Sequence, residues 1–478
     1  MADKERLQKA GDFDLDGALI VGSSGQRVNV LQQIIEINIY QNIETPYMSG
    51  SIMISDSAGV AELLPFLGQE RLLFTLRTPS RLGEVSFQKY HAIIYNVESR
   101  FTGTEREHVF ILNWTTLDHY KNMRLKVSQS FSGIISSIAQ KILTDEDLLG
   151  SNKPLNIEPT KNLRKYVIPN INPFQAINLI KNEAVSMFGS PHFLFFENPE
   201  GYHFRSLDSL IGKTGSLSVK HKKTFKTGPT FDPNDIESST SNIYDWKVED
   251  NSNSFLGVKL GMYASTLYYH DIFNKNFQKF EYDYIKDSYN KRNTTSQGNR
   301  SSGALVSGAK IDDKKTITEF PDSKIFLHPT ASKEYHASAI TPTPNTDNNA
   351  DEWLQETESK KLMSDYFTLM VETYGDTNIM VGDMIEILIP ANKPLPAKGV
   401  DTNDPVLSGR YLITSLHHLV VPRDQMHTMT MTVMKDSFNN SAASKDTQYP
   451  NEPSGSADVG LSNTSQNLTV GVQSVDVP

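Results

Sequence analysis

Three strand-like segments occur twice in this chain, in the same order. The first set is Leu72–Arg77, Tyr90–Val97 and His108–Trp114, and the second is Met384–Pro390, Arg410–Leu416 and His427–Met434. Each set follows a polar turn that contains glycine, and each ends at an acidic residue that an aromatic residue follows two positions later. The pattern predicts one antiparallel β unit used twice. A doubled β unit favours a part built for symmetric assembly over a chemical site.

The length of 478 residues is too great for one ordinary core, and about 150 residues per domain suggests three or four domains. We expect a β-rich α+β fold with two similar antiparallel β-barrels, the second one discontinuous, plus an α+β module and an insertion. The expected divisions are an N-terminal arm (1–27), a first barrel (28–125), an α+β module (126–212), a second barrel (213–264 and 375–438), an insertion (265–374) and a flexible C-terminal tail (439–478).

Hydrophobic periodicity places the smaller elements. Apolar residues at helical spacing predict an amphipathic helix over Phe131–Leu143, with Ser130 as its N-cap. Asn172 and Pro173 favour the start of a second helix, which we expect to run to Gly189. The clearest hairpin joins 192–197 to 202–206. Further expected elements are strands at 35–40, 51–55, 243–249 and 255–264, a short helical turn at 60–67 and a helix at 351–372.

Composition excludes several classes of function. The formal net charge is −10, which argues against a non-specific nucleic-acid binder but would let DNA pass without sticking. The chain has no cysteine, so disulfides, zinc–thiolate sites and thiol nucleophiles are excluded. We see neither a targeting signal nor an apolar run near the ~18 residues of a membrane helix. We therefore expect synthesis in the cytoplasm.

A search for catalytic or metal-binding motifs is negative. His417 and His418 are adjacent on an expected strand and should point to opposite faces, so they are poor joint metal ligands. No HExxH, Walker A, GxGxxG or Gly-x-Ser-x-Gly pattern occurs. Chance pairs are inevitable among 56 acidic residues. The basic cluster at 220–226 is expected to be a solvated loop facing an acidic partner. We predict no catalytic, metal-binding or cofactor-binding residue.

The C-terminal strands carry a recognisable pattern in VETYGDTNIMVGDMIEILIP, LSGRYLITSLHHLV and HTMTMTVMKDSF. The residues that stand out are Gly375, Gly382, Asp383, Gly409 and Tyr411. This pattern resembles the closing barrel of the central baseplate hub proteins of contractile-tailed (myovirus) bacteriophages, and the hub domains of type VI secretion spike proteins. The resemblance extends in order over roughly residues 28–438.

The resemblance implies a structural protein of the virion, without enzymatic activity. It implies a homotrimer whose six barrels join a six-fold tail tube to a three-fold spike and line a channel for DNA ejection. The implied partners are the tail spike protein, a tail tube or tube-initiator protein, neighbouring wedge proteins and the C-terminus of a tape-measure protein, with DNA only as passing cargo and no membrane insertion.

Other classes of function remain open from the sequence. The chain could be a hub or spike component with cell-wall hydrolase activity, which would need an acidic cleft. It could equally be the hub of a phage-like contractile injection system. A receptor-binding adhesin would expose aromatic residues, and Tyr263, Tyr268, Tyr269 and Tyr282 are the candidates. We expect the tail to be ordered by a partner, with β pairing at 468–475.

Overall fold

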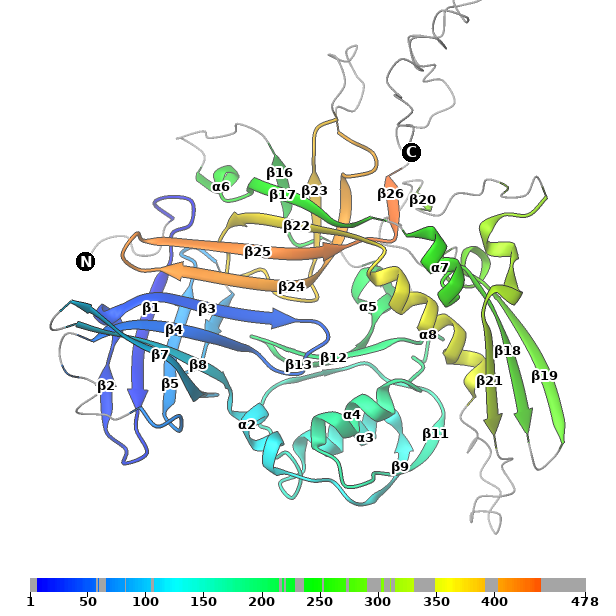
Figure 1. Cartoon of the computed structure of the whole chain (residues 1–478), viewed down its shortest axis with the longest axis horizontal. Coiled ribbons are helices and arrows are strands. Elements are labelled where there is room, and N and C mark those ends of the chain that lie inside the picture. Colours follow the sequence, from blue (N-terminus) through cyan, green and yellow to red (C-terminus); the bar gives the residue numbers. More distant parts are fainter. Residues whose placement is uncertain are drawn as a thin grey trace, which may run out of the picture.

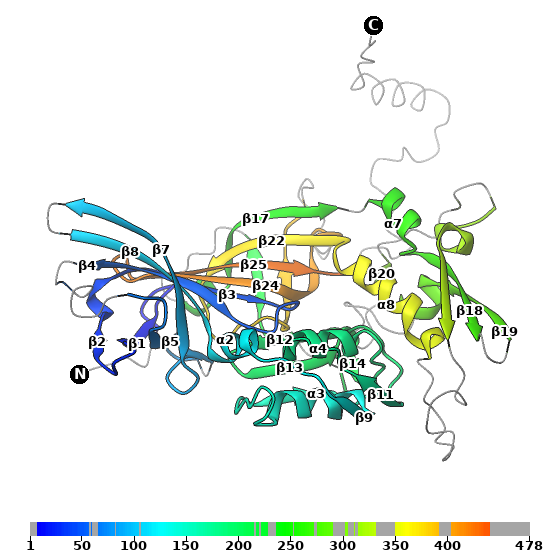
Figure 2. The same ribbon diagram turned by 60° about the horizontal axis from the view of Figure 1, so that its bottom comes forward.

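The computed structural model describes residues 7–439, apart from 57–58, 60–65, 82, 105–106, 215–216, 219–220, 228–235, 252, 272–274, 290–301, 305–309, 311–313, 331–348 and 392–402. The first barrel lies at one end of the molecule and the insertion at the other (Figures 1 and 2). The second barrel and the α+β module lie between them. The expected β pairing at 468–475 falls outside the described residues, as does the expected short helix at 60–67 except for residues 66 and 67.

The first barrel is a curled run of strands around one apolar core. Its strands are β1 (Asp14–Val21), β2 (Arg27–Asn29), β3 (Ile34–Asn42), β4 (Ser49–Asp56), β5 (Arg71–Arg77), β6 (Glu84–Ser86), β7 (Ala92–Thr104) and β8 (Glu107–Thr116). Inward residues alternate with outward ones, as a half-buried strand requires. The expected arm at 1–27 was wrong for its second half, because β1 pairs with β5 along its length and adds Ala18 and Ile20 to the core.

The second barrel is a closed ring of six strands. They are β16 (Thr224–Thr227), β17 (Asn242–Asn251), β22 (Phe367–Tyr374), β23 (Met384–Leu388), β24 (Gly409–Val421) and β25 (Met426–Met434). The ring closes because β24 pairs with β25 as well as with β23. The β-rich fold class with a discontinuous second barrel is therefore confirmed. One strand departs from the antiparallel expectation, since β16 is parallel to both β17 and β23.

The two barrels repeat one strand order. In the first it is β5-β7-β8-β4-β3, and in the second β23-β24-β25-β22-β17. The doubled trio is thus β5, β7, β8 and β23, β24, β25. The insertion enters at the connection between β17 and β22, where the first barrel has only the short turn between β3 and β4.

The α+β module forms a separate apolar core beneath the barrels. It contains α2 (Leu117–Arg124), β9 (Ser130–Ile134), α3 (Ile135–Thr144), β10 (Leu155–Ile157), β11 (Leu163–Val167), α4 (Pro173–Lys181), β12 (Phe193–Asn198), β13 (Gly201–Ser206) and α5 (Leu207–Ile211), followed by the short strands β14 (Lys213–Thr214) and β15 (Leu217–Ser218). The hairpin β12–β13 and the capping box of Asn172 with Gln175 confirm two expectations. Two others were wrong: Ser130 starts a strand rather than capping a helix, and α4 ends at Lys181.

The insertion is a three-stranded sheet on a long helix. Its elements are α7 (Ser254–Leu260), β18 (Ala264–Asp271), β19 (Asn276–Asp283), the π-helix η2 (Tyr284–Tyr289), β21 (Ile325–Thr330) and α8 (Ala350–Ser364). Short pieces complete the described chain: η1 (Leu31–Gln33), α6 (Ile236–Ser239), β20 (Ser302–Ala304), η3 (Ile317–Glu319), η4 (Pro321–Ser323) and β26 (Ser437–Asn439).

Two expected elements of this region were wrong. The segment 255–264 is helical rather than extended, because Asn253 caps α7 and Gly261 ends it in the left-handed conformation. The helix expected at 351–372 ends at Ser364, and Phe367–Tyr374 is the barrel strand β22.

Candidate assembly site at the junction of the two barrels

Strand β24 belongs to both barrels. Residues 409–412 pair with β23, whereas residues 415–420 pair with β3 of the first barrel, so that the two barrels form one 14-stranded sheet. The strand also supplies both cores: Tyr411 and Leu416 lie in the second core, and Val420 lies in the first. Figure 1 shows β3, β24 and β25 side by side across the junction. The barrels are therefore held at a fixed spacing by main-chain bonds.

A buried polar seam separates the two cores. Gln41 of β3, His418 of β24 and His427 of β25 are between 0 and 1% exposed. Nε2 of Gln41 is 3.4 Å from Nε2 of His418, and Nδ1 of His418 is 3.0 Å from Nε2 of His427. Because an amide nitrogen only donates, Nε2 of His418 accepts and its Nδ1–H donates to His427.

The seam holds its histidines neutral and fixes the loop before β23. Burial lowers the pKa of His427 to about 3 and holds that of His418 well below its usual range. The backbone N–H of Val381 donates to Oε1 of Gln41 at 3.3 Å, and that of Gly375 donates to the carbonyl of His427 at 2.8 Å. A Cβ on Gly375 would lie 2.1 Å from Cγ of the His427 ring, so only glycine fits.

The outward face of the junction, which we call the joint face, consists of the solvent-side residues of β3, β4, β24 and β25. They are mostly hydroxyl, amide and imidazole side chains: Asn38, Tyr40, Ser49, Ser51, Ser415, His417, Thr428, Thr430 and Thr432. Within these four strands, Glu36 is the one charged side chain that is not buried, since Asp56 and Arg410 are at most 4% exposed. The joint face therefore presents no ammonium or guanidinium group from these strands.

Hydrogen bonds order the centre of the joint face. Nδ2 of Asn38 donates to Oε1 of Glu36 at 2.6 Å, and Oδ1 of Asn38 lies 2.7 Å from Nε2 of His417. The His417 ring stacks on Tyr40 with 4.6 Å between centroids. Partial burial lowers the pKa of His417, although Glu36 opposes the shift. As the sequence predicted, His417 and His418 point to opposite sides of the strand.

The residues that carry the sequence resemblance lie on and around β23 and β24. Gly382 adopts φ +88°, and its N–H donates to the carbonyl of Ile413 at 3.0 Å. Asp383 accepts from the N–H of Met380 at 2.8 Å, and its burial raises its pKa. Gly409 starts β24 at φ +140°, and the fully buried Tyr411 donates its Oη–H to the Leu407 carbonyl at 2.5 Å.

A buried lysine completes this corner of the second barrel. Nζ of Lys435 donates to the carbonyls of Val406 and Ser408, and it lies 4.7 Å from the centroid of the Tyr411 ring. Burial lowers the pKa of Lys435 to about 7. No carboxylate contacts this amine among the described residues, so it supports the strand crossing rather than an ion pair.

The basic cluster finds its acidic partners within the chain. Nζ of Lys222 is 2.9 Å from Asp383, and Nζ of Lys223 is 2.8 Å from Asp376. The expectation of a solvated loop was therefore wrong for these two residues, which tie β16 to the loop before β23.

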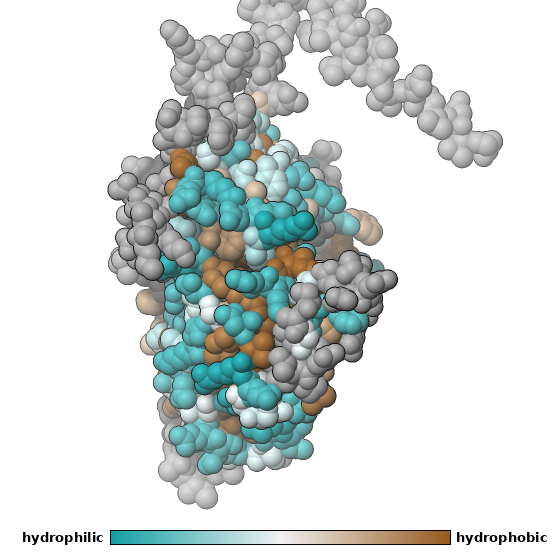
Figure 3. Space-filling model, turned by 90° about the vertical axis from the view of Figure 1, so that its left-hand side faces the viewer, coloured by the Kyte–Doolittle hydropathy of each residue, from teal (hydrophilic) through white to brown (hydrophobic). Residues whose placement is uncertain are grey.

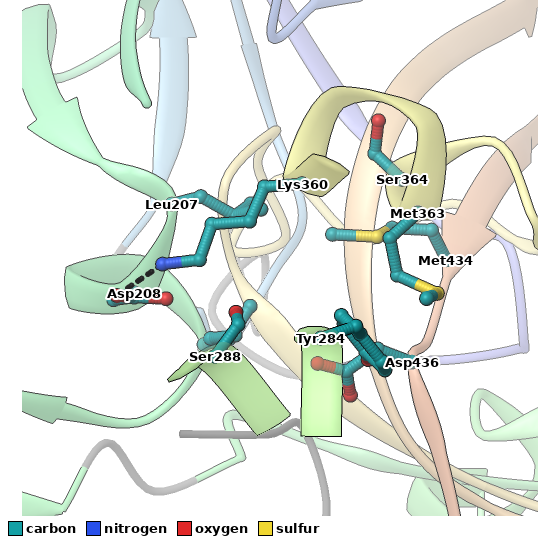
Figure 4. Close-up of a pocket in the computed structure, with 10 residues that line it drawn as sticks. Leu207, Asp208, Tyr284, Ser288, Lys360, Met363, Ser364, Met434 and Asp436 are labelled. Carbon is teal, nitrogen blue, oxygen red and sulfur yellow. Dashed lines mark hydrogen bonds and ion pairs between the residues drawn. The ribbon is translucent and has the colours of Figure 1, made fainter. Parts of the chain in front are cut away.

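A small pocket lies where the insertion meets α5 and the end of β25. Leu207, Asp208, Tyr284, Lys360, Met434 and Asp436 are among the residues that line it (Figure 4). Nζ of Lys360 lies 2.7 Å from Asp208 and 2.8 Å from Glu356. Burial alone would lower the pKa of Lys360, but these two carboxylates outweigh it and raise the pKa. This pairing attaches α8 to the α+β module.

The end of the first barrel presents apolar surface. Figure 3 shows apolar side chains gathered there among polar ones. In the same barrel, Leu67 is 66% and Tyr95 51% exposed, and Gly68 lies against the Tyr95 backbone. The part of the chain that the structure describes contains no cluster of three or more residues fit to hold a metal ion, and no helix long and apolar enough to span a membrane.

The seam was missed by sequence reasoning. Gln41 and His427 occupy inward positions in otherwise apolar alternating strands, and that break in alternation was the available signal. Only the tertiary structure shows that the two breaks meet.

No family model and no curated protein matches the chain. Among solved structures, it is similar to a tail protein from Neisseria meningitidis, at 12% identity and TM-score 0.49, over 89% of this chain and 96% of that one. It is also similar to a 43 kDa tail protein of a Shewanella oneidensis prophage, at 8% identity and TM-score 0.49, over 89% and 98%. A third is an Escherichia coli component of the type VI secretion system, at 9% identity and TM-score 0.39, over 88% and 76%.

Proposed function

We propose that this chain is a structural subunit of a contractile-tail baseplate, a homotrimeric central hub that joins a six-fold tail tube to a three-fold spike. The observation that carries the proposal is the pair of barrels with one strand order, fused through β24 into a single sheet. Two equivalent units per chain give six positions in a closed trimer, which reconciles three-fold with six-fold symmetry.

The joint face suits the wall of a DNA passage. DNA is held by proteins chiefly through cationic side chains that displace its counterions. The four strands of the joint face offer hydroxyls, amides and Glu36, and no exposed cation. A wall of this composition lets a polyanion pass without retention.

The polar seam and the β24 junction make the unit rigid enough to serve as a docking platform. The hub would contact a tube or tube-initiator protein on one side and a spike protein on the other, with wedge proteins around it and a tape-measure C-terminus within reach. The apolar end of the first barrel is a candidate subunit contact, because exposed apolar patches occur at interaction sites. The protein would act in the virion tail and would perform no catalysis itself.

The mass of the purified chain tests the proposal most directly. Light scattering coupled to size exclusion should give three times the chain mass of 53.6 kDa. Class averages in negative stain should show a ring with six similar lobes and a central opening. A chain that stays monomeric up to high concentration would refute the hub.

A charge substitution tests the passage. Asn38→Lys with Thr430→Lys places two cations on the joint face, and the assembled variant should retain a short DNA duplex at low salt in fluorescence anisotropy. The matched control is Asn276→Lys with Gln278→Lys on the exposed strand β19, which adds the same two charges and should leave DNA binding at the wild-type level. Equal DNA binding by wild type and the joint-face variant would remove the basis for the passage.

A further inference from the structure

The two barrels correspond in local detail as well as in strand order. The backbone N–H of Ile94 donates to the carbonyl of Glu70 at 2.8 Å, as Ile413 does to Asp383 at 3.0 Å. Both strands then bulge at once, β7 between Ile94 and Asn96 and β24 between Ile413 and Ser415. Strand β7 is thus the counterpart of β24, and both have 13 residues.

The partner strands correspond in the same way. Strand β3 bulges between Ile34 and Glu36 against β4, and β17 bulges between Ile243 and Asp245 against β22. Aligning the bulges makes Trp246 the counterpart of Ile37 and Val248 the counterpart of Ile39. Strand β17 is therefore the counterpart of β3.

The junction within the chain pairs β24 with β3, and their counterparts β7 and β17 take no part in it. Residues 415–420 of β24 pair with 37–42 of β3. In the described chain, the corresponding edges, β7 beyond residue 95 and β17 from 246 to 251, pair with no third strand. Within the described residues, strand pairing inside each barrel leaves both edges unoccupied, because β5 pairs with β7 only at 92–93 and β16 pairs with β17 only at 242–243.

Side chains are less buried on the unpaired edges than at the corresponding positions of the paired edges, as expected where a neighbouring strand is missing. Ile37 and Ile39 of β3 are 0% exposed, whereas their counterparts Trp246 and Val248 of β17 are only partly buried against the second core. Val97 of β7 is likewise partly buried, whereas its counterpart Leu416 is 1% exposed. An unpaired strand edge offers free N–H and C=O groups to another strand, so the edges of β7 and β17 can each pair with a further strand.

We propose that β17 of one subunit pairs antiparallel with β7 of a second copy of this chain, repeating between subunits the β3–β24 junction found within each subunit. This inference rests on the proposed trimer and names its interface. Three junctions within chains and three between chains would alternate around the ring.

Strand β7 bulges a second time between Val97 and Ser99, so Ser99 lies opposite Ile111 of β8 as His417 lies opposite Thr430 of β25. Ser99 is therefore the counterpart of His417. Because His417 lies opposite Tyr40, and Glu249 follows the counterpart of Ile39, the transferred register places Glu249 opposite Ser99 of the neighbour.

Cysteine cross-linking tests this register cleanly, because the chain has no cysteine of its own. The full-length double variant Ser99→Cys with Glu249→Cys should form disulfides under mild oxidation, since paired strands bring Cα atoms within the 4.4–6.8 Å that a disulfide needs. On non-reducing gels a closed ring should appear as covalent dimer and trimer and no larger species. The matched control is Ser99→Cys with Tyr244→Cys, five residues earlier in β17 and outside the proposed pairing, which should remain uncross-linked.

Amide hydrogen exchange gives a second readout without substitutions. The outer-edge amides of 246–251 and 96–102 should exchange at least about tenfold more slowly in the trimer than in a diluted monomer. Equal exchange in both forms would contradict the strand pairing.

The outcomes separate the two proposals. A trimer by light scattering that yields no covalent trimer with Ser99→Cys and Glu249→Cys overturns the strand pairing and leaves the hub intact. A trimer that cross-links equally through Tyr244→Cys overturns the register. A protein that is monomeric throughout overturns the hub itself.

Discussion

Replacing His427 by glutamine should make the protein less sensitive to acid. Burial lowers the pKa of His427 to about 3 in the folded protein, against about 6.5 when unfolded. The folded state therefore holds the ring neutral, while the unfolded state takes up a proton below pH 6.5. Stability from this group is complete above pH 6.5 and is lost as the pH falls towards 3.

The size of the effect follows from the pKa difference. Each pH unit inside the window costs about 1.4 kcal/mol, so the wild type should lose about 2 kcal/mol between pH 6.5 and pH 5 through His427 alone. His192, with a pKa lowered by burial to about 3, adds a similar loss, but it is present in both proteins and cancels in the comparison.

Urea unfolding of wild type and His427→Gln at pH 7.5, 6.0 and 5.0 measures the difference. At pH 7.5 the variant should be the less stable protein, since it lacks the bond from Nδ1 of His418. By pH 5.0 that gap should shrink by about 2 kcal/mol. A gap that stays constant over this range would refute the account of His427 as a buried neutral histidine.

Three further substitutions have defined outcomes. Gly375→Ala should lower the free energy of unfolding by about 3 kcal/mol, because its Cβ would lie 2.1 Å from the His427 ring; an unchanged melting temperature would contradict this. Lys153→Met should cost about 3–5 kcal/mol in urea unfolding, because it leaves the buried Glu197, 2.5 Å from Nζ, without its cation. In the wild type, the unfolded chain protonates Lys435 below about pH 10, whereas the folded protein does so only near pH 7, so the wild type loses stability as the pH falls from 10 to 7. Lys435→Met lacks this loss and should therefore gain about 1.4 kcal/mol per pH unit relative to wild type over that range. Parallel curves of unfolding free energy against pH would exclude the buried neutral amine.

Local sequence patterns predicted the strands and hairpins of this fold correctly where one periodicity fitted the segment. The predictions of secondary structure failed where a helical and a strand periodicity both fitted it. Apolar residues from Trp353 to Val371 match a helical spacing, but the chain turns at Asp365 and the last of them alternate in β22. In 255–264, Gly261 at φ +86° ends a helix that the apolar side chains alone did not distinguish from a strand. In both segments, tertiary packing determines whether the chain is helical or extended.

The candidate site was harder to predict because it is non-local. Gln41 and His418 meet although they lie 377 residues apart in the sequence, and neither carries a motif. The resemblance of the C-terminal strands located Gly375, which packs against the seam, but not the seam itself. Only the pairing of β3 with β24, which no local pattern encodes, brings these residues together.

The pairing of β3 with β24 also has a mechanical consequence. The strands are antiparallel over residues 37–42 and 415–420, and their hydrogen bonds lie across the strand direction. A pull along the strands loads all of these bonds at once in shear, whereas a pull across them opens the ladder one bond at a time. A tension that drew the two barrels apart along β24 would therefore be carried by the whole ladder of bonds between β3 and β24 at once.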